Sequence, residues 1–306
     1  IPVIKMSGRG LGYTGGTIDK LESIPGYRID LSDEEILKQV HDIQFVITGQ
    51  TACLVPMDKA VYALRDVTST VSSIPLIASS IMSKKIASGA DKIIIDIKVG
   101  NGALLQTRDD AKKLSEIMIK IGEVYQREVR CIISDMNVPL GKCIGNSLEV
   151  LEAIDVLKGK EVDNNFVELC YELATEMVSM GKEVSKKEAS LLVREAIESG
   201  KAYQKFLEML KYQKGHIEGI KVSDKKVTLK AKKEGTLKKI NALEIGKLSL
   251  SLGAGKVYKD DKIDYSVGIK LNKLVGDVVK AGDVLATLYV KNKVSDVNLD
   301  DIFTIH

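Results

Sequence analysis

The chain has 306 residues, and 45 Lys and Arg against 42 Asp and Glu leave a formal net charge of +3. This near balance excludes a protein built around binding a polyanion. With 44% hydrophobic and 28% charged residues the chain is not of the disordered class, and its length allows two domains or one large lobe with an appendage. Aromatic residues are scarce at 5%, so no nucleic-acid partner is expected.

The sequence also indicates the cellular compartment in which the protein works. It has no run of about 18 uncharged apolar residues and no signal-peptide pattern, and its four cysteines lack CxxC spacing. We therefore expect reduced thiols, no membrane partner and a cytoplasmic enzyme. Because the chain starts without Met and runs from a strand directly into a glycine-rich turn, we expect it to be the middle of a longer protein.

The first 56 residues begin with a short strand that breaks into a loop with six glycines between Gly8 and Gly26. Ser32 and Glu35 have the spacing of a capping box, which predicts a helix from there to about Val40. Residues 44–48 and 52–55 then predict a pair of strands.

Residues 57–87 have a helical pattern in two pieces, which breaks around Ser72, Ser73 and Pro75 and ends at Gly89. The next stretch predicts a right-handed βαβ unit. Residues 92–100 and 129–134 are apolar runs typical of buried parallel strands. Between them, apolar residues recur at helical spacing: Leu114, Ile117, Met118, Ile121, Val124 and Tyr125.

Asn146 and Glu149 form a possible N-cap pair for a helix to about Leu157, and three amphipathic helices are expected between residues 164 and 212. Beyond Gly215 the pattern alternates with period two and is punctuated by glycines, which predicts a mostly β domain over 216–306. Residues 273–290 resemble the barrel-sandwich modules that carry biotin or lipoate, but a purely structural module is the better interpretation because no Met-Lys-type turn is present.

Two segments could carry chemistry. In the loop SGRGLGYTGGT, glycine amides and the hydroxyls of Ser7, Thr14 and Thr17 could bind a phosphate, with a tight surface loop as an equal alternative. In residues 62–85, Arg65, Ser80 and Lys84 offer two cations and a hydroxyl. The spacing of Ser80 and Lys84 puts both on one helical face, where they could clamp a planar base. Taken alone, Arg65 and Lys84 are more often solvated surface charges.

Four segments, SGRGLGYTGGTIDKLESIPG, YALRDVTSTVSSIPLIASSIMSKK, DIKVGNGA and SDMNVPLGKCIGNSLEVLEAI, together resemble the pyrimidine-nucleoside phosphorylase and thymidine phosphorylase family in order. The resemblance covers almost the whole chain. It implies an α/β fold with a helical lobe, a large mixed α/β lobe, a cleft between them and a C-terminal β-rich α+β domain. The implied domains are 1–56 and 89–215 for the α/β lobe, 57–88 for the helical lobe with the dimer interface, and 216–306 for the C-terminal domain.

The resemblance implies reversible phosphorolysis of pyrimidine nucleosides such as uridine, thymidine and deoxyuridine to the free base and a (deoxy)ribose 1-phosphate. Arg65 and Lys84 match catalytic residues that stabilise the leaving base. With Tyr62, which packs on the base, and Ser80, they match the family's base-binding set. Leu104 stands where the family has an aromatic residue of the base pocket.

The resemblance also implies that Ser7 and Thr17 hold inorganic phosphate, the co-substrate. The family's main phosphate loop, of Lys-His-Ser-Thr-Gly-Gly type, would lie upstream of Ile1. A structural cation, K⁺ or another ion, would be held near Leu140, Cys143 and Glu152, although Glu152 could equally be an ordinary helix-surface carboxylate. The expected assembly is a homodimer.

Two alternatives stay open at the level of sequence. One is a related phosphoribosyltransferase of the anthranilate type, which would need an acidic metal-binding pair that is not evident beside KVGNG. The other is an inactive base-binding fragment.

Overall fold

The computed structural model describes residues 1–10, 15–49, 55–58, 61, 68, 70, 72–160, 165–258, 261–294 and 297–306. Within them the chain forms two compact units, each assembled from three stretches of sequence. The first unit comprises Ile1–Met6, Asp30–Asp135 and Glu168–Ala196, and the second comprises Ser7–Ile29, Met136–Val167 and Ile197–His306. Both mix helices and strands, which confirms the predicted α/β class.

The first unit has two pairs of strands with helices between and after them. Its strands are most of β1 (Val3–Ser7), β2 (Phe45–Gly49), β3 (Lys92–Val99) and β4 (Glu128–Asp135). Its helices are α2 (Asp33–Ile43), α4 (Ile74–Ala87), α5 (Arg108–Val124), most of α7 (Asn165–Lys182) and most of α8 (Lys186–Glu198). β1 pairs with β2, and β3 pairs with β4.

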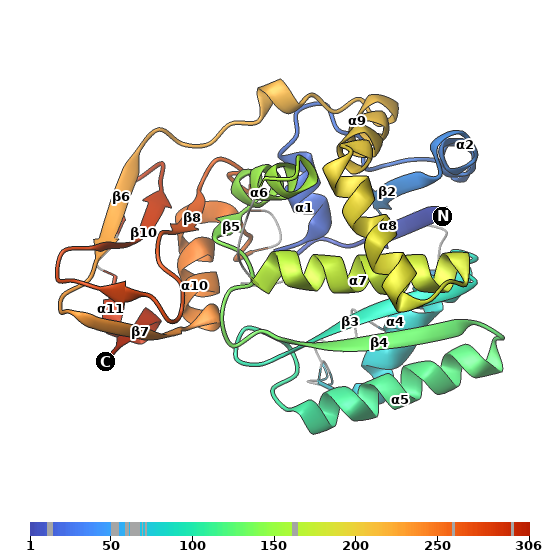
Figure 1. The fold of residues 1–306 in the computed structure, drawn as a ribbon, viewed down its shortest axis with the longest axis horizontal. Coiled ribbons are helices and arrows are strands. Elements are labelled where there is room, and N and C mark those ends of the chain that lie inside the picture. Colours follow the sequence, from blue (N-terminus) through green and yellow to red (C-terminus); the bar gives the residue numbers. More distant parts are fainter. Residues whose placement is uncertain are drawn as a thin grey trace. The chain divides into compact units, whose positions relative to one another are not determined.

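The βαβ unit predicted from residues 92–134 is confirmed. β3 and β4 are parallel, in a register that places Lys92 opposite Glu128 and Val99 opposite Asp135. The inward-facing residues of β3 share one hydrophobic core with the apolar faces of α4 and α5, and Figure 1 shows α5 running along these strands. Burial of Leu114 and Met118, with Ile117 and Ile121 packed against the same core, explains the helical spacing of these residues, whereas Val124 and Tyr125 at the end of the predicted pattern are exposed.

The capping box of α2 is confirmed, because Ser32 Oγ accepts from Glu35 N at 3.2 Å while Ser32 N donates to the Glu35 carboxylate at 2.9 Å. The helix runs to Ile43, three residues beyond the predicted end, and Gln44 ends it in the left-handed conformation. The predicted strand 44–48 is present as β2. Most of its predicted partner, 52–55, lies outside the described residues.

The second unit holds two antiparallel sheets and their covering helices. One sheet has the order β5 (Cys143–Gly145), β8 (Gly268–Leu271), β10 (Val284–Tyr289), β6 (Lys226–Lys230), and the other has the order β11 (Phe303–Ile305), β7 (Gly235–Ile240), β9 (Val278–Val279). One core cluster joins both sheets, including Leu237, Ile269 and Leu288. The prediction that the chain beyond Gly215 is mostly β structure is therefore confirmed.

The helices of the second unit are α1 (Thr17–Glu22), α6 (Ser147–Leu157), α9 (Lys201–Tyr212), α10 (Ala242–Ser249) with a π-helical extension over Leu250–Ala254, α11 (Leu299–Ile302) and a 3-10 turn at Ile217–Gly219. The predicted start of α6 is confirmed, but its predicted cap is wrong. Asn146 makes no capping bond and donates instead to the carbonyl of Ala254 at 2.8 Å, while Glu149 accepts from Gly145 N at 3.1 Å.

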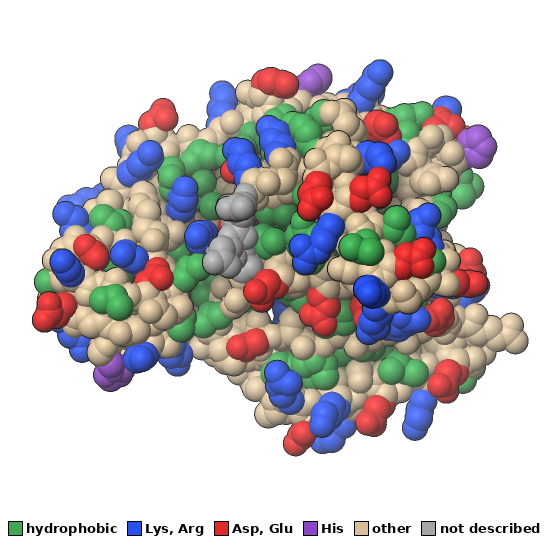
Figure 2. All heavy atoms as spheres, viewed as in Figure 1, with side chains coloured by type: hydrophobic (Ala, Val, Ile, Leu, Met, Phe, Trp, Pro, Cys, Tyr) green, Lys and Arg blue, Asp and Glu red, His purple; other side chains and the backbone are tan. Residues whose placement is uncertain are grey.

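On the face of the molecule drawn in Figure 2, Lys and Arg side chains are interspersed with Asp and Glu. This agrees with the nearly balanced composition of the chain. No helix among the described residues combines the length and hydropathy needed to cross a membrane.

Candidate active site

Lys84 and Ser80 meet on the first unit's helix α4, one turn apart. Lys84 Nζ donates to Ser80 Oγ at 2.8 Å and to the Ser80 carbonyl at 2.9 Å, as their four-residue spacing predicts. Ser80 is 7% exposed and the Lys84 side chain 20% exposed. For Lys84, the alternative of a solvated surface charge is therefore wrong.

Sequence reasoning missed the residue that fixes this ammonium. Asp58 forms an ion pair with Lys84 Nζ, and its side chain is only 11% exposed. This carboxylate contact, together with the two bonds to Ser80, orients the ammonium and limits the rotation of the lysine side chain. The two residues are 26 positions apart, so no helical or strand spacing could have paired them.

The next residue of α4, Lys85, adds to the positive charge of this region. Burial, with a smaller contribution from the nearby charges of Lys5 and Lys84, lowers the pKa of the Lys85 ammonium to about 8. Burial also lowers the pKa of Lys5, on β1. Positive charge gathered in this way would stabilise a bound or developing negative charge.

Two residues of the predicted base-binding set, Tyr62 and Arg65, lie outside the described residues. Leu104 stands in the turn between β3 and α5 and is 56% exposed, whereas its neighbour Leu105 is buried and bridges to Val99. The Leu104 side chain is thus not part of the core in the part of the chain that the structure describes, and it is available to a ligand.

A polar cluster at the carboxyl ends of the parallel strands β3 and β4 was not predicted. Ser134 Oγ donates to Asp96 at 2.5 Å, and Lys98 Nζ donates to Ser134 Oγ at 3.1 Å and forms an ion pair with Asp96. The register of the strands places Ser134 opposite Lys98. Ligands of parallel α/β sheets bind at this end of the strands. Pairing the two strands by sequence alone could have found the cluster, because both segments were predicted as buried strands.

In the second unit, the glycine-rich loop connects Ser7, the last residue of β1, to Thr17, the first residue of α1. Both side chains are half-buried, and neither hydroxyl forms a hydrogen bond within the described part of the chain. A Cβ at Gly16 would collide with the backbone of Arg9 and Gly10, so glycine is required where the two ends of the loop come together. Two free hydroxyls beside a tight glycine turn are compatible with binding an oxyanion.

Arg9, within the same loop, is not free to bind phosphate by itself. Its guanidinium donates to Asp19 at 2.9 Å and to both oxygens of Glu22, at 2.5 and 2.8 Å. These contacts raise the pKa of Arg9 and, with a hydrogen bond from Tyr265, lower the pKa of Glu22. The bidentate pair fixes the loop to α1.

The predicted cation site is a tight turn closed by Glu152. The Glu152 carboxylate accepts from Lys142 N at 2.8 Å and Cys143 N at 3.2 Å, and it lies against Gly141, where a Cβ would collide with it. Because Glu152 is only 9% exposed, the alternative of a helix-surface carboxylate is wrong. The Leu140 carbonyl accepts from Phe166 N at 3.0 Å.

The ligands that this turn could offer a cation are oxygens. Burial raises the pKa of the Cys143 thiol to about 12, so the sulfur stays protonated and only the carbonyl of that residue could bind. Carbonyl and carboxylate oxygens are the ligands that hard cations prefer. Among the described residues, no group of three or more His, Cys, Asp and Glu side chains could hold a metal ion.

Comparison of the sequence with known proteins identifies the family to which this chain is similar. Residues 1–203 match the glycosyl transferase family a/b domain, and residues 236–302 match the pyrimidine nucleoside phosphorylase C-terminal domain. The pyrimidine-nucleoside phosphorylase of Staphylococcus haemolyticus (strain JCSC1435) is 48% identical over 309 residues, which cover 99% of this chain and 70% of that protein. Those of Staphylococcus aureus (strain bovine RF122 / ET3-1) and Staphylococcus epidermidis (strain ATCC 12228 / FDA PCI 1200) are each 47% identical over 315 residues, covering 100% of this chain and 72% of each relative.

Because residues 1–203 match the a/b domain of this family, the chain belongs to the glycosyl transferases. More narrowly, the chain belongs to the pyrimidine-nucleoside phosphorylase family.

Proposed function

We propose that this protein catalyses the reversible phosphorolysis of pyrimidine nucleosides, with uridine, thymidine and deoxyuridine as the substrate class. The observation that carries the proposal is the pair on α4. Lys84 presents an ammonium, and Ser80 a hydroxyl, at one point of the first unit, 2.8 Å apart. The family match, and the identity to named phosphorylases over 99% of this chain and 70% of the relative, support the same activity over a phosphoribosyltransferase.

The reaction breaks the bond between C1′ of the sugar and N1 of the base while an oxygen of phosphate forms a new bond to C1′. The electron pair of the broken bond stays on the pyrimidine, where it spreads onto the carbonyl oxygens. Lys84, held by Asp58, and Arg65 would stabilise this charge most when the bond is nearly broken. The pyrimidine anion takes a proton from water as it leaves. Because phosphate itself attacks C1′, no covalent enzyme intermediate is required.

On the phosphate side, the hydroxyls of Ser7 and Thr17 support the proposed binding of the co-substrate. Each would donate one hydrogen bond to a charged oxygen, worth roughly 1.5 to 3 kcal/mol. We expect Ser7→Ala combined with Thr17→Val to raise the KM for phosphate at least tenfold and the KM for nucleoside less than twofold. Equal changes in both constants would contradict the assignment. Ser251→Ala, at an exposed hydroxyl of the second unit, is the control.

The proposal also includes a cytoplasmic homodimer and a monovalent cation such as K⁺ at the turn of Leu140, Cys143 and Glu152. A donor set made only of oxygens favours a hard cation there. Light scattering of the purified full-length protein tests the dimer, and a mass corresponding to a single chain would rule it out.

The decisive experiment is release of uracil or thymine by the full-length protein with and without phosphate. We expect phosphate-dependent release, and we expect Arg65→Ala and Lys84→Ala each to lower kcat/KM by on the order of 100-fold or more. Lys113→Ala, at an exposed lysine on α5, is the matched control. Near-wild-type phosphorolysis by both active-site variants would exclude the proposed roles.

A further inference from the structure

A chain of contacts joins the glycine-rich loop to the C-terminal domain within the second unit. Arg9 binds Glu22 through two hydrogen bonds, and the hydroxyl of Tyr265 donates to the same carboxylate at 3.0 Å. Glu22 and Tyr265 are 243 positions apart in the sequence. Arg9 Nη1 and the Tyr265 hydroxyl share the oxygen Oε2 of Glu22, while Arg9 Nη2 binds Oε1, so the orientation of this carboxylate depends on both residues.

The Arg9 contact controls the loop backbone as well as a side chain. Asp19, which is buried, accepts from Arg9 through one oxygen and from Gly10 N through the other, at 2.7 Å. Asp19 and Glu22 stand one turn apart on α1, so they hold Arg9 and Gly10 together. Arg9 and Gly10 lie two and three positions after Ser7. The position of the Ser7 hydroxyl therefore depends on how firmly these two residues are held.

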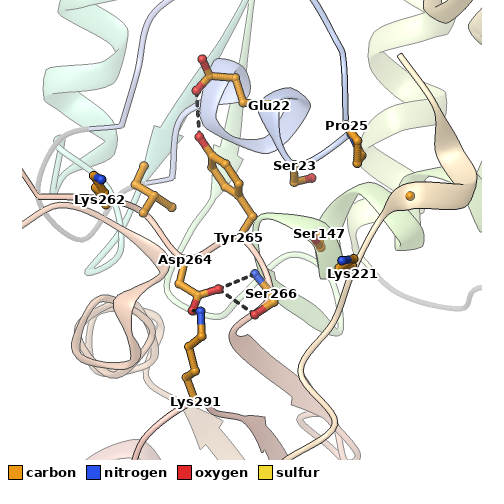
Figure 3. A pocket seen from close by; sticks show the side chains of 12 residues that line it. Glu22, Ser23, Pro25, Ser147, Lys221, Lys262, Asp264, Tyr265, Ser266 and Lys291 are labelled. Atoms are coloured by element: carbon orange, nitrogen blue, oxygen red, sulfur yellow. Dashed lines mark hydrogen bonds and ion pairs between the residues drawn. The ribbon is translucent and has the colours of Figure 1, made fainter.

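Tyr265 is itself firmly supported. Its neighbour Asp264 accepts from Ser266 N at 3.0 Å and Ser266 Oγ at 2.6 Å and pairs with Lys291 at 2.9 Å, while the Tyr265 carbonyl accepts from Ser147 N at 3.2 Å. Figure 3 shows the Tyr265 ring extending from this anchored segment to Glu22 along the wall of a hollow of about 670 Å³. Burial and the adjacent Glu22 carboxylate raise the pKa of Tyr265 to about 12, so its hydroxyl stays a donor at neutral pH.

We propose that Tyr265 is a positioning residue for phosphate binding, which fixes Glu22 so that Arg9 holds the glycine-rich loop in the conformation that presents Ser7 and Thr17. This inference rests on the proposed function, since it assigns Tyr265 a role at the phosphate side of that site. It gives the C-terminal domain a part in substrate binding although Tyr265 itself need not touch phosphate. Removing the phenol oxygen leaves Glu22 with one partner fewer and the loop with one restraint fewer.

The test is Tyr265→Phe in the full-length protein, measured with phosphate and nucleoside varied separately. We expect the KM for phosphate to rise about three- to tenfold, with kcat and the KM for nucleoside changed less than twofold. Glu22→Gln, which keeps the shape but loses the charge that binds Arg9, should raise the KM for phosphate further. Tyr258→Phe, at an exposed tyrosine of the same domain, is the matched control and should change neither constant.

A second readout does not depend on activity. Hydrogen–deuterium exchange of the peptide that contains Gly10 should be faster in Tyr265→Phe than in the wild type, because the Gly10 amide is protected by Asp19. An unchanged phosphate KM together with unchanged exchange would overturn the positioning role. If Ser7→Ala with Thr17→Val raises the phosphate KM in the same assay, the proposed function survives that result. If the wild type releases no base, the proposed function fails, and the exchange measurement alone decides whether Tyr265 restrains the loop.

Discussion

The ammonium of Lys85 is buried next to two other lysines, and this placement costs stability while the group is charged. Its pKa in the folded protein is about 8, against 10.5 for an unhindered lysine. Between these two pH values the unfolded chain binds the proton and the folded protein does not, so stability rises with pH in this window. Below pH 8 both states are protonated, and the full cost is present.

We therefore expect Lys85→Met to be more stable than the wild type at pH 7, and its advantage to shrink by about 2 kcal/mol between pH 7 and pH 10. Urea unfolding of both proteins at the two pH values measures this difference. Lys120→Met, at an exposed lysine on α5, is the matched control. A constant advantage for Lys85→Met would show that the lysine keeps its proton throughout.

Asp58 offers a second test at the scale of single residues. Without its carboxylate, Lys84 keeps its charge but loses the contact that orients it, so Asp58→Asn should lower kcat/KM for nucleoside about tenfold, less than Lys84→Ala. Steady-state kinetics checks the order of the two variants. Asp110→Asn breaks an exposed ion pair with Lys113 and is the control. A larger loss in Asp58→Asn than in Lys84→Ala would mean that Asp58 has a role of its own.

The range over which residues interact explains which features of the site the sequence predicted. Ser80 and Lys84 were paired correctly because four residues of helix bring them together. Asp58 was missed because its contact with Lys84 depends on how two separate segments pack, which no local pattern encodes. The link from Glu22 to Tyr265 was missed for the same reason.

At the scale of elements, helix starts show how tertiary contacts override local signals. Ser32 and Glu35 cap α2 as their spacing predicts, because both members of this capping box lie within one turn of the chain. Asn146 has equally good local chemistry, yet its amide binds the distant carbonyl of Ala254. The helix was predicted correctly because its apolar periodicity is local, and the cap was not because its best partner is far along the chain.

The turn closed by Glu152 gives a prediction at this scale. Glu152→Ala would leave two backbone N–H groups without their acceptor, so we expect a loss of about 2 to 4 kcal/mol in the free energy of unfolding. Glu152→Gln keeps one acceptor and should lose less. Asp155→Asn, on the exposed side of the same helix, should change stability by less than about 0.5 kcal/mol. Chemical denaturation of the three variants gives the comparison.

Replacing K⁺ in the buffer by a bulky organic cation tests whether the turn closed by Glu152 binds a cation or is held by Glu152 alone. A cation that binds only the folded state stabilises it by an amount that grows with the cation concentration relative to its Kd, so its removal should lower the melting temperature of the wild type but not of Glu152→Gln. Equal melting temperatures of the wild type in both salts would leave Glu152 as a purely structural clamp.

At the scale of the whole molecule, the fold class was predicted from local sequence patterns. These are the apolar runs and helical spacing before Gly215, and the alternation of period two with glycines after it. The division of the chain into two compact units did not follow, because each is built from three separated stretches. Sequence patterns report which element a segment forms, and they carry little information on which distant segments it joins. The domain limits expected from family resemblance, such as 57–88, stay a prediction.

The interleaving of the two units has a consequence for the order in which they can fold during synthesis. The last stretch of the first unit ends at Ala196, whereas the sheet of the second unit needs β5 near residue 144 to pair with β8 near residue 269. A ribosome makes roughly 5 to 20 residues per second, so β5 leaves the exit tunnel many seconds before its partner exists. During that interval the first unit can close around its own core, whereas Ser7–Ile29, with the glycine-rich loop, has to wait for later partners in its own unit, such as Met209, which accepts from Tyr27, and Tyr265, which donates to Glu22.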